Sequence, residues 1–93
     1  MAVTFHIPGP LQNMTGGKAT VRVDSSPHSV KEALAALWEL HPGLRDRVAD
    51  EQGRVREHIN VFVGDESIRF SGGLETPLRA DSDIFIVPAV SGG

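Results

Sequence analysis

The sequence contains no cysteine among its 93 residues. A disulfide framework, a zinc site with thiolate ligands and a side-chain thiol nucleophile are therefore excluded. The histidines do not supply a metal site instead, because no two of them have the four-residue spacing of helical metal ligands. We expect His6, His28, His41 and His58 to be surface or structural residues. The sequence predicts no metal site on this chain.

Long apolar runs and clusters of positive charge are also missing. No stretch approaches the length of a membrane span, and the first residues lack the basic start and apolar core of a signal peptide. The nine Lys and Arg residues are scattered and the formal net charge is -3, so the basic stripe that binds nucleic acid is absent. We expect a cytoplasmic protein that binds neither a membrane nor a nucleic acid.

Two motifs typical of catalytic or phosphate-binding proteins are incomplete. The stretch TGGKAT, residues 15–20, lacks a phosphate-binding loop's first glycine, where Gln12 stands, and its Ser or Thr after the lysine, where Ala19 stands. Acidic residues fall mostly in expected turns and on the polar helix face, and no paired carboxylates can be picked out. The sequence therefore predicts no catalytic residue and no enzyme activity of its own.

Hydrophobic residues form 40% of the chain and charged residues 23%, an ordinary globular composition. A chain of this length forms at most one domain with a single core. Alternation of apolar and polar residues predicts an opening hairpin of two strands, near residues 2–8 and 18–24. A third strand is expected near 58–63, then a turn at Gly64 and Asp65 and a second short strand near 66–70. The last strand directs Ile84 and Ile86 inward, with Phe85 and Val87 outward.

One helix is expected after Ser29. Ser29 and Glu32 match the Ser-x-x-Glu capping box, which satisfies free N–H groups at a helix start. The apolar positions that follow have helical spacing: Val30, Ala33, Leu34, Leu37 and Leu40 or His41. Pro42 and Gly43 then end the helix. A short helical piece is expected within residues 44–50.

These elements predict an α+β fold, in which one main helix packs on one face of a mixed sheet of about five strands. The other face stays open to solvent. We expect Phe62, Phe85 and Val87 to lie near one another on it, where exposed aromatic residues typically mark a partner surface. The alternative is that loops cover them.

The chain ends with VPAVSGG, so five uncharged residues follow the last predicted strand and Pro88. We expect a domain over residues 1–88 and a flexible tail over residues 89–93. Glycine has no Cβ and can enter a narrow channel in another protein's active site, although a terminal Gly-Gly alone is a weak signal. The terminal carboxylate would be the reactive group: an acyl-adenylate supplies a good leaving group, and attack by sulfur gives a thiocarboxylate.

The order of elements and the last third of the sequence resemble the ubiquitin-like β-grasp sulfur carriers of the ThiS/MoaD family. The matching positions are Leu78, Asp83, Ile84, Ile86, Pro88, Val90, Gly92 and Gly93. Residues 51–78 are similar to the longer, CysO-type carriers of bacterial cysteine biosynthesis. One departure is Ser82, where the family has glycine between two acidic residues. Because serine disfavours positive φ, the departure leaves the geometry of this turn open.

The resemblance implies a β-grasp fold and a carrier that is not itself a catalyst. Gly93 would be the site of covalent sulfur attachment, through an adenylate and a thiocarboxylate. Residues Ala89, Val90, Ser91 and Gly92 would thread partner active sites, and Phe62, Phe85 and Val87 would form the partner docking face.

The implied partners are enzymes, and the cofactors belong to them. An ATP-dependent adenylyltransferase/sulfurtransferase would activate the tail, a pyridoxal-phosphate cysteine synthase would accept the sulfur, and a zinc metalloprotease would release cysteine. The carrier itself would bind no cofactor. Three alternatives stay open: a sulfur donor for molybdopterin, thiazole or tRNA thiolation, a ubiquitin-like modifier of lysines, and a non-covalent β-grasp interaction module.

Overall fold

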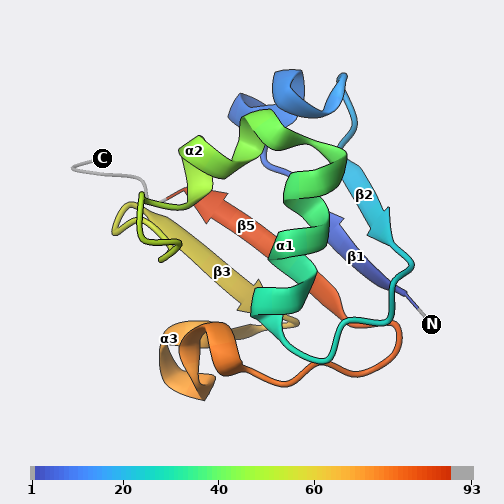
Figure 1. Cartoon of the computed structure of the whole chain (residues 1–93), viewed down its shortest axis with the longest axis vertical. Helices are drawn as coiled ribbons and strands as arrows, with labels where there is room; N and C mark the ends of the chain where they lie inside the picture. The colour runs from blue at the N-terminus through green and yellow to red at the C-terminus, as the bar shows by residue number, and fades with distance from the viewer. Residues whose placement is uncertain (1, 89–93) are drawn as a thin grey trace.

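The computed structural model describes residues 2–88 as a mixed sheet with one long helix across one face (Figure 1). Five strands form the sheet: β1 (Val3–His6), β2 (Thr20–Val23), β3 (Ile59–Val63), β4 (Glu66–Ser67) and β5 (Asp83–Pro88). Three α-helices accompany them: α1 (Val30–Leu40), α2 (Arg45–Val48) and α3 (Ile68–Ser71). Three 3-10 turns complete the elements: η1 (Gly9–Thr15), η2 (Pro42–Leu44) and η3 (Gly73–Glu75).

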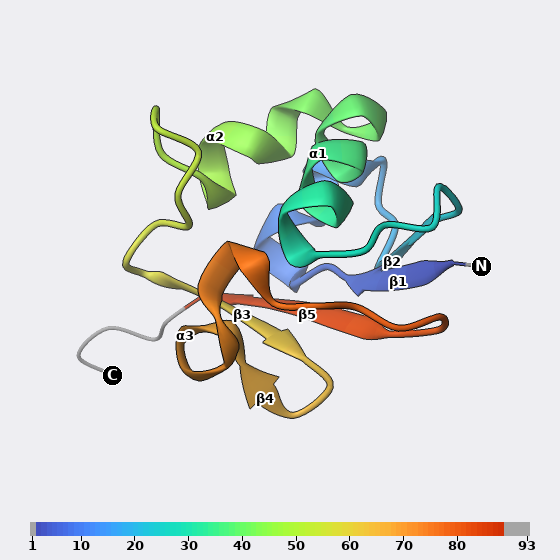
Figure 2. The same cartoon turned by 60° about the horizontal axis from the view of Figure 1, so that its bottom comes forward.

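The strand order is β2-β1-β5-β3-β4, so the first and last strands lie side by side. They pair in parallel, whereas β2 pairs with β1, and β3 with both β5 and β4, in antiparallel fashion. Helices α1 and α2 lie on the same side of the sheet (Figure 2). The predicted α+β, β-grasp architecture, with its opening hairpin, is confirmed.

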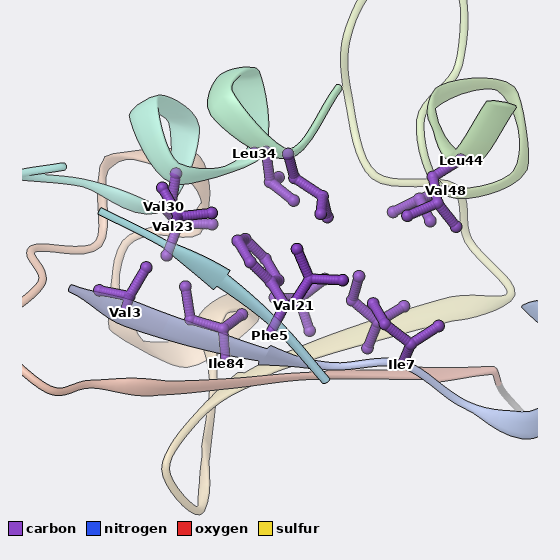
Figure 3. Packing of buried hydrophobic residues seen from close by; sticks show 14 of the residues in the cluster. Val3, Phe5, Ile7, Val21, Val23, Val30, Leu34, Leu44, Val48 and Ile84 are labelled. Carbon is purple, nitrogen blue, oxygen red and sulfur yellow. The ribbon is translucent and has the colours of Figure 1, made fainter. Parts of the chain in front are cut away.

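The core fills the space between α1 and the sheet. Phe5 of β1 and Ile84 of β5 are directly paired, and both side chains are fully buried. Figure 3 shows Phe5 and Ile84 beneath Val30 and Leu34 of α1. The period-two pattern of the strands therefore predicts correctly which side chains face the core, because one face of the sheet is buried.

Helix α1 begins as the capping box predicts. Ser29 Oγ accepts a hydrogen bond from the Glu32 N–H at 3.3 Å. In a capping box the Glu32 carboxylate would accept from the Ser29 N–H. Here it accepts from the N–H of the preceding residue, His28, at 3.1 Å. The expected apolar stripe stops early: Leu40 is 54% exposed, and Leu44 in η2 is fully buried just beyond the helix.

The expectation of a short strand after the Gly64 turn is wrong in its length. Strand β4 covers only Glu66 and Ser67, and the chain then turns into α3. Ser67 Oγ caps this turn by accepting the Arg69 N–H at 3.3 Å. The Arg69 guanidinium donates to the Glu57 and Ile59 carbonyls across the gap to β3, at 2.9 and 3.2 Å. Tertiary contacts to β3 thus override the weak strand pattern.

The turn before β5 is formed without a glycine. Asp81 has the positive φ, 64°, and aspartate is among the few residues that tolerate this region. Ser82 contributes its hydroxyl instead, accepting the Arg79 N–H at 3.0 Å and donating to the Arg79 carbonyl at 2.8 Å. The departure at Ser82 therefore leaves a well-bonded turn.

None of the helices between residues 2 and 88 has the length and apolar character needed to cross a bilayer.

Replacing Ser29 with alanine removes the acceptor for the Glu32 N–H at the start of α1. Loss of such a cap costs about 1 kcal/mol of unfolding free energy, which lowers the Tm of a domain this size by roughly 4–8 °C. Calorimetry of the Ser29→Ala variant checks this, with Ser25→Ala, at a nearby exposed serine, as the control. Equal Tm values for the two variants would contradict the capping role.

The two faces of the sheet should differ in their contribution to stability. Phe5→Ala empties a fully buried site and should cost about 3–5 kcal/mol. Phe62 lies on the opposite face and is only partly buried, so Phe62→Ala should cost about 1 kcal/mol. Urea unfolding measures both, and a similar loss in the two variants would refute the assignment of faces.

Candidate functional site

Strand β5 carries the chain to the point where the predicted tail begins. Its last residue, Pro88, pairs with Ile59 at the start of β3. The predicted attachment and threading residues, Ala89, Val90, Ser91, Gly92 and Gly93, lie outside the described residues. Their roles stay predictions, and the geometry available is that of the surface beside Pro88.

The three residues of the predicted docking face lie together on the side of the sheet opposite α1. Phe62 and Phe85 face each other directly across the β3–β5 pair, and Val87 follows two residues later on the same face. Val87 is 41% exposed, while both phenylalanines are partly buried. The register confirms their proximity, and their role in docking remains a prediction.

A histidine, and not a loop, covers part of this face. The His6 ring stacks on the Phe85 ring with 4.2 Å between centroids and 12° between planes. His6 Nε2 lies 2.9 Å from Asp83 Oδ1, so the ring is held both on its face and at its edge. No sequence pattern predicts this pair, because His6 and Asp83 are 77 residues apart and the β1–β5 pairing brings them together.

The stacked rings belong to a row that crosses the whole sheet. The registers align Thr20, His6, Phe85, Phe62 and Ser67, one from each strand. Aromatic side chains occupy the middle of this row and hydroxyl side chains occupy its ends. The face therefore has an apolar centre with a polar border, the arrangement typical of a protein interface.

Charged groups on this face are paired within the chain. Arg22 of β2 donates through Nε to Asp24 at 2.9 Å, and this hydrogen bond, together with the charge of Asp24, raises the pKa of Arg22. Both side chains are exposed, at 70% and 71%, so the pair adds little to stability.

A groove opens on this face beside Pro88. The β1–β5 ladder ends at the His6–Phe85 pair, because Pro8 has no N–H to donate toward β5. Beyond His6 only the β2 side of β1 continues, where the Ile7 N–H donates to the Ala19 carbonyl. The two strands part there and leave a groove of about 210 Å³. Its lining residues are His6, Ile7, Pro8, Phe85, Ile86 and Val87.

The remaining features of residues 2–88 include the loop at 15–20, the acidic and histidine side chains, and one exposed aromatic residue. In the loop at residues 15–20, the buried Thr15 hydroxyl donates toward the Lys18 and Gln12 carbonyls at 2.7 and 3.0 Å, a structural role. Across residues 2–88, no cluster of three His, Asp or Glu side chains could hold a metal ion. Phe70 of α3 is 86% exposed, more than Leu40 or Val87.

Comparison with known proteins places this fold and its tail in one family. Sulfur carrier protein CysO of Mycobacterium tuberculosis is 35% identical over 95 residues, covering all of both chains. Small archaeal modifier protein 1 of Haloferax volcanii is 37% identical over 78 residues, or 83% of this chain and 85% of the relative.

A solved structure agrees with these relatives. A chain in the crystal structure of the Amycolatopsis orientalis BexX/CysO complex superposes with a TM-score of 0.86 at 37% identity, covering 98% of this chain and 99% of that one. The family model described as ThiS family matches residues 5–93, a range that includes the final two glycines. The chain belongs to the ThiS family.

Proposed function

We propose that this chain is a sulfur carrier, and that the carboxylate of Gly93 is adenylated and then converted to a thiocarboxylate. The observation that carries the proposal is the extent of the family match, which runs through Gly92 and Gly93. The CysO relative aligns over the whole of both chains, so the tail has a counterpart in a protein named as a sulfur carrier.

The chemistry has two steps. A carboxylate oxygen of Gly93 attacks the α-phosphorus of ATP, the bond to the β-phosphate breaks, and pyrophosphate leaves. Hydrosulfide then attacks the carbonyl carbon, the bond to AMP breaks, and the sulfur's proton passes to solvent. One terminal oxygen is thereby exchanged for sulfur, and no thiol of this chain competes for the activated carbonyl, since the sequence has no cysteine.

In this scheme the chain is a co-substrate and its partners are the enzymes. An adenylyltransferase/sulfurtransferase binds the ATP, and the carrier needs no cofactor of its own. Residues Ala89, Val90, Ser91 and Gly92 thread the partner's active site, because their small or absent side chains suit a narrow channel.

The face formed by Phe62, Phe85 and Val87 docks the partner. Val87 directly precedes Pro88, and the five residues that follow extend the chain by at most ~18 Å. An enzyme that holds the Gly93 carboxylate therefore also lies against this end of the sheet. The exposed Val87 and the partly buried Phe62 and Phe85 supply contact area that the tail alone lacks.

Cysteine biosynthesis is the pathway we favour, since the CysO relative is matched over its full length. A pyridoxal-phosphate cysteine synthase joins the thiocarboxylate sulfur to its amino-acid substrate, whose leaving group departs, so that cysteine is formed on the tail. A zinc metalloprotease then hydrolyses the bond between cysteine and the tail and regenerates the Gly93 carboxylate. A second candidate is attachment to target lysines through an isopeptide bond, and the identity to a small archaeal modifier protein supports it.

Sulfur loading is tested by the intact mass of the chain after incubation with ATP, Mg²⁺, an adenylyltransferase and sodium sulfide. We expect the mass change of one oxygen replaced by sulfur, and none in a variant that lacks Gly93. The truncated variant should keep the wild-type Tm, because a terminal residue contributes little packing. An unmodified wild-type chain, under conditions that load a known carrier, would refute the proposal.

The pathway is tested by supplying the loaded chain to the cysteine synthase with its amino-acid substrate, followed by the metalloprotease. We expect free cysteine in proportion to the thiocarboxylate consumed, and none from the chain in its carboxylate form. Lysine-linked conjugates without free cysteine, in a lysate that contains both enzymes, would favour the modifier function instead.

A further inference from the structure

We propose that His6 is a specificity-determining residue of the docking face. Held by Asp83 against Phe85, its ring forms one wall of the groove beside Pro88, and this groove takes one apolar side chain of the adenylyltransferase. The inference rests on the proposed function, because the partner is the enzyme that activates Gly93.

The His6 ring is held in place by two contacts. Asp83 and Phe85 alternate on one face of β5, and their partners on β1 are Thr4 and His6. The ring of His6 covers Phe85 while its edge reaches back to the Asp83 carboxylate at 2.9 Å. A side chain fixed before binding loses little entropy when a partner packs on it.

The groove has His6 as one wall and an otherwise apolar lining. It exists because Pro8 ends the β1–β5 ladder, so the strands part just beyond the His6–Phe85 pair. Among its six lining side chains only His6 is polar. His6 Nε2 is engaged by Asp83 and the other five lining side chains are apolar, so the groove accepts an aliphatic or aromatic side chain more favourably than a charged one.

The position of the groove indicates which protein supplies the side chain that fills it. Val87 lines the groove and adjoins Pro88, so the groove lies where the tail begins. The five residues after Pro88 reach at most ~18 Å. The enzyme that holds the Gly93 carboxylate therefore has its surface beside the groove, and one apolar side chain from that surface covers the exposed part of Val87.

The contribution of His6 to binding can be separated from its contribution to folding. His6 and Asp83 keep 34% and 53% of their side-chain surface exposed. A polar contact between side chains that stay exposed to water contributes little to stability. Substitutions at His6 should consequently leave the fold intact and act on the complex with the enzyme.

The test uses steady-state kinetics of the adenylyltransferase that loads the wild-type chain, with the carrier as the varied substrate. We expect His6→Ala to raise the KM for the carrier about 5–10-fold, the effect of losing one aromatic contact at an interface. The kcat should not change, because the chemistry at Gly93 is untouched. His28→Ala, at an exposed histidine near the start of α1, should leave both constants at wild-type values.

Two further variants separate the ring from its hydrogen bond. His6→Phe keeps the ring and should stay within about threefold of the wild-type KM, whereas His6→Asn keeps a donor for Asp83 and should behave like His6→Ala. Asp83→Ala should raise KM about threefold in the wild-type background and have no effect in the His6→Ala background. Tm values within about 3 °C of wild type show that the variants are folded.

A KM for His6→Ala within twofold of wild type, or a fall in kcat at unchanged KM, overturns the inference while the sulfur-carrier function stands. If the wild-type chain is not loaded by any adenylyltransferase, the proposed function falls, and the inference falls with it.

Discussion

The parallel pairing of β1 with β5 is the contact on which the other features depend. It joins the first strand to the last and places Phe5 opposite Ile84 at the centre of the core. The same register lays His6 on Phe85 on the other face of the sheet. A slip of one residue would exchange the buried and exposed sets along β5, so core packing also determines the composition of the open face.

The two faces of the sheet differ in their exposure to water. The side under α1 excludes water and holds the fold together, as the buried cluster shows (Figure 3). The opposite side keeps an aromatic centre partly covered and a groove beside Pro88. Because β5 contributes alternate residues to both sides, it connects the stable core, the predicted docking surface and the start of the predicted tail within six residues.

This arrangement suits a carrier whose reactive group is a main-chain carboxylate. A side-chain nucleophile would need a pocket to position and activate it, whereas a terminal glycine is positioned by the enzyme that receives it. In the proposed function the domain has two tasks, which are to present the tail and to be recognised by the partner enzyme. Membership of the ThiS family and a match that extends to Gly93 agree with that division.

Features that depend on a few neighbouring residues could be predicted from the sequence. These are the Ser29 cap, the period-two strands and the helical stripe through Leu37, because each depends on residues close together in the chain. The turn of α3, which Arg69 anchors to β3, and the contact of His6 with Asp83, 77 residues away, could not be predicted in this way. Such contacts require a strand register, and that register is set by how the whole core packs.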